Sequence, residues 1–170
     1  MINLFKATSD HIDQVLEIGR STFIDTFAEQ NTPEDLAKYI NKAFHIEQVR
    51  SEVLNPDSLF FLAELGDQII GYLKLNIGKA QSDVNDSESL EIERIYVKKD
   101  FIGKEVGKLL FEKALSTAHE LNLKYIWLGV WEHNPRAIRF YEKQGFQQFG
   151  THTFVLGEDV QTDLLLKLYL

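Results

Sequence analysis

The chain has 170 residues, of which 44% are hydrophobic and 12% aromatic, so it is long enough for one domain, residues 1–170, with a substantial apolar core. It contains no cysteine, which excludes disulfides and thiolate-bound metals, and its formal net charge of −8 argues against a nucleic-acid partner. The N-terminal residues lack a signal-peptide pattern, and no apolar run approaches the roughly 20 residues that span a bilayer, so we expect a cytoplasmic protein without a membrane partner.

The N-terminal third of the chain is predicted to be mainly helical. Ser9 or Asp10 can cap a first helix, whose apolar residues recur at helical spacing. A second helix has Thr32 as its N-cap and Pro33 in its first turn, where a missing N–H costs nothing. The expected elements are, in order, a strand over residues 4–7, a helix through Phe23, a helix through Phe44 and a helix over residues 46–54.

The rest of the chain has the pattern of a mixed sheet. A strand over residues 89–97, a long helix and a strand over residues 125–130 form a right-handed crossover, which makes the two strands parallel. The other expected elements are a hairpin of strands 59–65 and 69–77, a polar loop to residue 88, a helix from residue 134 and strands over 147–156 and 162–170. The predicted fold class is therefore α/β, with a mixed central β-sheet, a parallel pair at its centre and helices on both faces.

The start of the crossover helix is a candidate anion site. Ligands of such sheets bind at the carboxyl ends of the parallel strands, beside the N-terminus of the crossover helix. Gly103 and Gly107 would let a ligand approach the free N–H groups of that helix start, near Gly103 and Lys104. Four lysines cluster here in an otherwise acidic chain, namely Lys98, Lys99, Lys104 and Lys108. A phosphate-bearing cofactor fits this end, although a solvated helix start would explain the lysines equally well.

A second motif is the stretch N-P-R-A-I-R-F-Y-E-K-Q-G-F at residues 134–146. Asn134 and Tyr141 lie seven residues apart, about 700° around a helix, so they share one face. Taken singly, Asn134 could be an N-cap and Tyr141 a core residue. Their combination with Ala137 and the Gly-Phe exit favours a catalytic role.

Together the two motifs resemble the Gcn5-related N-acetyltransferase (GNAT) superfamily over nearly the whole chain. The resemblance implies the GNAT fold and acetyl-coenzyme A as co-substrate, without a metal. The family's loop pattern is Q/R-x-x-G-x-G/A, from which Ile102 and Glu105 depart and which Gly107 matches, so weakened cofactor binding is expected. The cofactor-binding residues implied by the resemblance are Ile95, Tyr96, Val97, Gly103, Lys104, Glu105, Val106, Gly107, Lys108, Asn134, Tyr141 and Lys143.

Three further stretches are similar to the Pai-type bacterial acetyltransferases of spermidine and spermine. They are T-F-I-D-T-F-A-E-Q-N-T-P-E-D-L at 22–36, L-E-I-E-R-I-Y-V at 90–97 and W-L-G-V-W-E-x-N at 127–134. This narrower resemblance implies a polyamine as the amine substrate. Other amines, such as aminoglycosides, small amines or protein lysines, remain alternatives, and a homodimer is compatible with the resemblance.

The chemistry of amine acetylation requires a base and favours an acid. A primary amine with a pKa near 10.4 is only about one part in 10³ neutral at pH 7.4, so a carboxylate base, acting through water, is expected. Glu91 and Glu93 lie two apart on one strand and point to the same face, although a solvated strand face would look the same. Glu93, nearer the strand's carboxyl end, is slightly favoured. Tyr141 is the expected acid for the leaving thiolate.

Substrate-binding residues are expected on both sides of the parallel pair. Trp131 and Glu132 follow a parallel strand, where they could wall the acceptor channel, although packing alone would explain Trp131. Asp25 and Glu29 could bind the distal ammonium groups of a polyamine, or form a solvated helix end. The histidines show no metal-ligand spacing. A second hypothesis is a coenzyme-binding regulatory module without turnover, which the departures in the glycine loop would favour.

Overall fold

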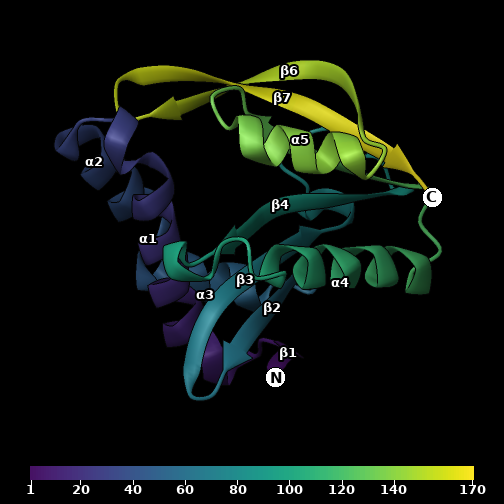
Figure 1. Ribbon diagram of the computed structural model, residues 1–170, viewed down its shortest axis with the longest axis horizontal. Helices are drawn as coiled ribbons and strands as arrows, with labels where there is room; N and C mark the ends of the chain where they lie inside the picture. The colour runs from purple at the N-terminus through teal and green to yellow at the C-terminus, as the bar shows by residue number, and fades with distance from the viewer.

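The fold is built on one seven-stranded sheet, seen in the computed structural model of residues 1–170 (Figure 1). The strand order is β1-β2-β3-β4-β5-β7-β6. The strands are β1 (Ile2–Lys6), β2 (Ser58–Leu65), β3 (Gln68–Asn76), β4 (Ser89–Val97), β5 (Tyr125–Trp131), β6 (Gln147–Leu156) and β7 (Asp159–Tyr169). All neighbours are antiparallel except β4 and β5, which confirms the predicted parallel pair at the centre of a mixed sheet.

Helices cover both faces of this sheet, as the fold class predicts. On one face lie α1 (Ile12–Phe27), α2 (Pro33–Ala43) and α3 (Ile46–Leu54), and on the other lie α4 (Val106–Glu120) and α5 (Pro135–Lys143) (Figure 1). Each face has its own apolar core, because alternate residues of a strand point to opposite sides. Leu73 and Leu75 of β3 pack toward α4, whereas Tyr72 packs toward α1.

The central strands separate at their carboxyl ends. β4 and β5 pair from Ser89 and Tyr125 only as far as Ile92 and Leu128, although β4 continues to Val97 and β5 to Trp131. A β-bulge directly follows Ile92, because Lys74 and Leu75 of β3 face Arg94 and Ile92, which leaves Glu93 without a partner on β3. The sheet is therefore split open at the edge where the crossover helix α4 begins.

Several expected boundaries are corrected by local backbone chemistry. The first turn is capped by Thr8, not by Ser9 or Asp10, and forms a short 3₁₀ segment before α1 begins at Ile12. Thr32 caps α2 as predicted, with its side chain accepting the Asp35 N–H. The last strand begins earlier than expected, because a tight turn at Gly157 joins β6 directly to β7. None of the helices combines the length and the apolar character needed to cross a membrane.

Candidate active site

A cavity of 260 Å³ occupies the split between β4 and β5. Its walls come from both faces of the sheet. Ala137 and Tyr141 reach it from α5 on one face, and Phe23 and Phe27 reach it from α1 on the other. Because β4 and β5 no longer pair here, the backbone N–H and C=O groups of β4 beyond Ile92 that point away from β3 are free to bind a ligand. The cavity thus joins two faces of the sheet through a gap lined by unpaired backbone.

The glycine loop before α4 leaves a row of backbone donors free. The N–H groups of Val106, Gly107 and Lys108 have no acceptor within the chain, as at any helix start without a side-chain cap. A Cβ added at Gly107 would meet nothing within 4 Å, so the approach to these donors is open. The helix begins at Val106, three residues later than Gly103. This cradle fits a diphosphate, because free N–H groups and the helix dipole both favour an anion.

Glu105 occupies the position in this loop where a glycine would be expected. Its φ is 64°, in the left-handed region that side chains rarely adopt, and Gly103 has a φ of 84°. The carboxylate is exposed and faces solvent at the mouth of the loop. The departure therefore carries backbone strain as well as an unfavourable charge.

Arg136 of α5 lies beside this loop, and sequence reasoning missed it. A Cβ built on Gly103 would lie 3.5 Å from Nη2 of Arg136, so the guanidinium in the first turn of α5 lies over the glycine loop. The position of Arg136 in the N-P-R motif could have indicated its role, since an Arg in the first turn of this helix can contact a phosphate. By contrast, Lys143 in the last turn of α5 is exposed and does not line the cavity, and neither does Val97.

Asn134 and Tyr141 lie together at the cavity, as their spacing predicts. The side-chain oxygen of Asn134 accepts the N–H of Ala137 at 3.2 Å, so Asn134 is also the N-cap of α5. Tyr141 is 5% exposed and packs edge-on against Phe140 and Phe146. Burial raises the pKa of Tyr141 well above its ordinary value of 10.0, so the hydroxyl stays protonated. Both residues have structural duties, yet both present a polar group to the cavity.

Glu91 is buried at one side of the cavity. Its carboxylate accepts hydrogen bonds from the Asn76 amide at 2.9 Å, from the Ser82 N–H at 2.8 Å and from the Ser82 hydroxyl. Burial nevertheless raises the pKa of Glu91, with Glu93 adding to the rise and the hydrogen bonds opposing it. Ser82, on the loop between β3 and β4, was not expected at the site.

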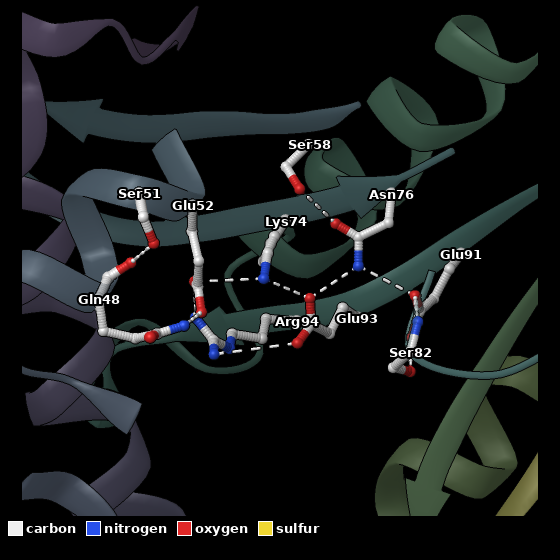
Figure 2. A network of polar contacts seen from close by, with 10 residues as sticks. All are labelled: Gln48, Ser51, Glu52, Ser58, Lys74, Asn76, Ser82, Glu91, Glu93 and Arg94. Carbon is white, nitrogen blue, oxygen red and sulfur yellow. Dashed lines mark hydrogen bonds and ion pairs between the residues drawn. The ribbon is translucent and has the colours of Figure 1, made fainter. Parts of the chain in front are cut away.

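Glu93 belongs to a network of buried charges (Figure 2). Lys74 Nζ lies 2.5 Å from Glu93 Oε2 and 3.2 Å from Glu52 Oε2, and the Arg94 guanidinium lies between the same two carboxylates. The Asn76 amide donates to Glu93 at 2.7 Å and so links it to Glu91. Burial alone would raise the pKa of Glu93, but Arg94 and Lys74 outweigh it and hold the pKa below its ordinary value. Glu91 and Glu93 lie on the same face of β4, and neither lies on a solvated strand face.

The expected substrate-binding residues divide into two groups. Trp131 is buried and lines the cavity, with its indole N–H donating to Gln161 at 2.8 Å. Glu132 is exposed and sits beside His133, outside the cavity. Asp25 and Glu29 also lie outside, because α1 turns Phe23, Thr26 and Phe27 inward and leaves Asp25 exposed on its outer side. Glu29 instead borders a separate, wholly polar surface hollow beside Asp35 and Glu158.

The structure adds a third group of polar residues that the sequence did not reveal. Asp163 of β7, His152 of β6 and Asp83 of the loop before β4 line the cavity on the side of α1 and α2. His152 Nδ1 lies 3.4 Å from Asp83 Oδ2, so the loop and β6 meet at the cavity mouth. The pairing of β6 with β7 brings His152 beside Asp163, and the loop before β4 adds Asp83. Nothing in the local sequence of these residues marks them as neighbours.

Comparisons with known proteins agree with this geometry. A profile of the acetyltransferase (GNAT) family matches residues 13–146. An uncharacterized N-acetyltransferase of Lactobacillus delbrueckii subsp. lactis is 40% identical over 166 residues, which cover 98% of this chain and 96% of that protein. A spermidine N(1)-acetyltransferase of Thermoplasma acidophilum is 24% identical over 150 residues, which cover 86% and 88% of the two chains.

The fold is also that of solved acetyltransferases. The crystal structure of the PaiA N-acetyltransferase from Thermoplasma acidophilum in complex with coenzyme A superposes with a TM-score of 0.81 at 21% identity, and the match covers 100% of this chain and 99% of that one. The ribosomal-protein-S18-alanine N-acetyltransferase from Escherichia coli gives a TM-score of 0.74 at 13% identity, covering 99% and 94%. The family profile spans most of this chain, and the chain therefore belongs to the GNAT family of acetyltransferases.

Proposed function

We propose that the protein transfers the acetyl group of acetyl-coenzyme A to a primary amine. One observation carries this proposal: the cavity in the β4–β5 split lies between Tyr141 on one face of the sheet and carboxylates on the other, and the sheet splits at the edge where the free anion cradle of α4 begins. An acyl donor and an amine that enter from opposite faces would meet in this gap. Membership of the GNAT family supports the same reaction.

The residues present fit coenzyme A as the acetyl carrier. The N–H groups at the start of α4, with Lys104, Lys108 and Arg136 nearby, would hold its diphosphate, and the unpaired edge of β4 at Ile95 and Tyr96 would bind its amide groups. When bound, the carrier supplies the acetyl group as a thioester. The related structure from Thermoplasma acidophilum contains coenzyme A, which supports this assignment.

Tyr141 would assist departure of the thiolate. A thiol has an ordinary pKa near 8.5, far below that of the buried Tyr141 hydroxyl, so the hydroxyl can donate a hydrogen bond to the sulfur throughout the neutral range. Asn134, on the same face of α5, has a free amide nitrogen that would help to orient the thioester.

Glu91 and Glu93 would make the acceptor side attractive to an ammonium group. Their oxygens are engaged by Asn76, Ser82 and Lys74, so we propose that they take part in proton removal only through a bridging water and by their negative charge. The aromatic rings of α1 and α2 that face them, Phe27 and Tyr39, would cover the hydrocarbon part of the acceptor and attract its cation.

The acceptor class we favour is a polyamine. The Thermoplasma relative is named for spermidine, and Asp83, Glu91, Glu93 and Asp163 give the cavity an excess of negative charge. We assign the distal ammonium to Asp83 at the cavity mouth, because Asp25 and Glu29 lie elsewhere. Protein lysines, N-terminal amines and aminoglycosides are the alternatives.

This proposal is tested by comparing spermidine with butylamine at low and at 0.5 M salt, a change that shortens the screening length several-fold. We expect a higher kcat/KM for spermidine, with an advantage that shrinks as salt is added. Asp83→Asn should raise the spermidine KM with little change in kcat, whereas Asp25→Asn should leave both unchanged. A preference for butylamine, or a preference for spermidine that does not change with salt, would reject the polyamine as substrate. Acetyl transfer to an amine would remain the proposed reaction.

A further inference from the structure

Asp163 is the carboxylate of the acceptor cavity that no other protein group engages. It lies on β7 directly opposite Trp131 of β5, is half-buried and lines the cavity. Its side chain accepts no hydrogen bond and forms no ion pair within the chain, whereas Glu91 holds three hydrogen bonds and Glu93 is tied to Lys74. A base must have a free lone pair within reach of the proton it takes, and Asp163 has one.

Gly129 leaves room for this carboxylate at the place where β4 and β5 part. Glu91 pairs with Trp127, so two residues further along Glu93 and Gly129 lie at corresponding places where β4 and β5 part. A Cβ at Gly129 would lie 3.4 Å from Asp163 Oδ2, so the carboxylate extends over the backbone of this exposed glycine. Glu93 and Asp163 therefore stand on either side of Gly129, on the face of the sheet that carries α1 and α2.

Burial makes the Asp163 carboxylate more basic than an ordinary one. Burial raises the pKa of Asp163, and His152, its register partner on β6, opposes the rise. A carboxylate with a raised pKa takes up a proton more readily than an ordinary one. The other titratable or charged groups that line the cavity are Tyr39 from α2, Asp83 from the loop before β4, Tyr141 from α5, and Glu91, Glu93, Arg94 and Tyr96 from β4.

We propose that Asp163 is the catalytic base that removes the proton from the acceptor ammonium by direct contact, an inference that rests on the proposed amine acetylation. The ammonium gives one proton to the Asp163 carboxylate, and the freed nitrogen lone pair forms the new C–N bond while the C–S bond breaks. The second proton of the nitrogen ends on the leaving thiolate, beside Tyr141. Asp163 then returns its proton to water, so that protons and electrons balance.

The test compares wild type, Asp163→Asn and Asp163→Glu with acetyl-coenzyme A and spermidine over a range of pH. Asp163→Asn should lower kcat/KM at pH 7 by about 100-fold to 10,000-fold, the range of general base catalysis, and Asp163→Glu should recover part of it. The acidic limb of the wild-type profile should vanish in Asp163→Asn, whose rate should rise about tenfold per pH unit toward the amine pKa. Carboxyl ¹³C NMR of wild type without substrates should give Asp163 the same pKa as that limb.

Controls separate this inference from a structural effect. Glu158→Gln, on the exposed turn of the same hairpin, should behave as wild type, and Asp163→Asn should keep the thermal shift with coenzyme A. A normal rate and pH profile in Asp163→Asn, a loss confined to KM, or an NMR pKa at or below 3.8 for Asp163 would overturn the assignment. If wild type acetylated no amine at all, the proposed function itself would be wrong and this inference would fall with it.

Discussion

Single residues at this site differ in function because their partners differ. Glu91 and Glu93 are two apart on β4, yet burial raises the pKa of Glu91, while Arg94 and Lys74 outweigh burial and lower that of Glu93. Asp163 has neither partner, and only His152 opposes the effect of burial on its pKa. Three carboxylates that look alike in a sequence therefore differ: Glu91 is a buried hydrogen-bond acceptor, Glu93 is a member of ion pairs, and Asp163 is a free base.

Tyr141 gives the prediction that belongs to this scale. Tyr141→Phe should fold, because the ring and its edge-on contacts with Phe140 and Phe146 remain, but should lose one to three decades in kcat, since the leaving sulfur loses its donor. Because the pKa of Tyr141 is raised, its hydroxyl stays protonated and wild-type kcat should show no loss from its ionisation up to pH 10. Steady-state kinetics check both points, with Tyr169→Phe as an exposed control. Equal kcat in Tyr141→Phe would leave Tyr141 a packing residue.

At the scale of elements, the start of α4 combines a good anion cradle with a residue, Glu105, that suits its backbone conformation poorly. The free N–H groups of its first turn are oriented by the helix, but Glu105 must adopt a left-handed φ of 64° to lead into them. Left-handed backbone costs a residue with a side chain about 1–2 kcal/mol, and glycine escapes most of that cost. The loop therefore keeps its shape at the expense of stability and of charge complementarity.

Glu105→Gly should improve both properties. We expect a gain of about 0.5–1 kcal/mol in the free energy of unfolding, after the added chain entropy of glycine, and tighter binding of coenzyme A. Thermal melting with and without coenzyme A measures the two effects. Glu112→Gly, in the interior of α4 with ordinary helical backbone, should instead cost about 1 kcal/mol and leave coenzyme A affinity unchanged.

The opposite change at this element is Gly107→Glu. The added side chain and charge would occupy the open space in front of the free donors, so coenzyme A should no longer raise the melting temperature. A full thermal shift in this variant, or none in wild type at millimolar coenzyme A, would contradict the assignment of the cradle.

At the scale of the whole molecule, the buried charge network connects the site to stability. Lys74 and Arg94 each form ion pairs with both Glu52 of α3 and Glu93 of β4. These pairs connect α3 to β4 beside the acceptor cavity. All seven strands belong to one sheet, so the network lies at the junction of this sheet with its helical layer. Opening the network would leave charges buried without partners, which is far more costly than losing an ion pair at the surface.

Glu93→Gln makes the consequence measurable. The folded-state pKa of Glu93 is lowered, so its contribution to stability is present above its ordinary value of 4.5 and is lost as pH falls through the folded-state value. Urea unfolding should show the variant less stable by about 3 kcal/mol at pH 7, with the difference from wild type shrinking below pH 4.5. The pKa of Asp163 is raised by burial and not by Glu93, so Asp163 titrates alike in both proteins and cancels in this difference, whereas the pKa of Glu91 should fall in the variant because the Glu93 charge helps to raise it. A difference that is constant down to acid pH would show that Glu93 is not ion-paired in solution.

Local patterns in the sequence predicted the parallel pair, the helices on both faces and the spacing of Asn134 and Tyr141, because these depend on hydrophobic period and helix geometry. Local patterns failed for residues whose position depends on contacts between elements that are distant in the sequence. Asp163 reaches the cavity only because β7 pairs with β5, and Asp25 misses it because α1 turns Phe23 and Phe27 inward instead. The inward phase of α1 was readable from the spacing of those two aromatics, whereas the position of Asp163 was not readable from any local pattern.

The most direct test of the central claim is to follow thiol release from acetyl-coenzyme A by the wild-type protein with spermidine, and to identify the product by mass spectrometry. Amine acetylation in the β4–β5 split predicts saturable release of one thiol for each acetylated spermidine, and none when the amine is omitted. If coenzyme A stabilises the protein but no thiol is released with spermidine, spermine, lysine peptides or aminoglycosides, the protein is a coenzyme-binding module and the claim of amine acetylation is wrong.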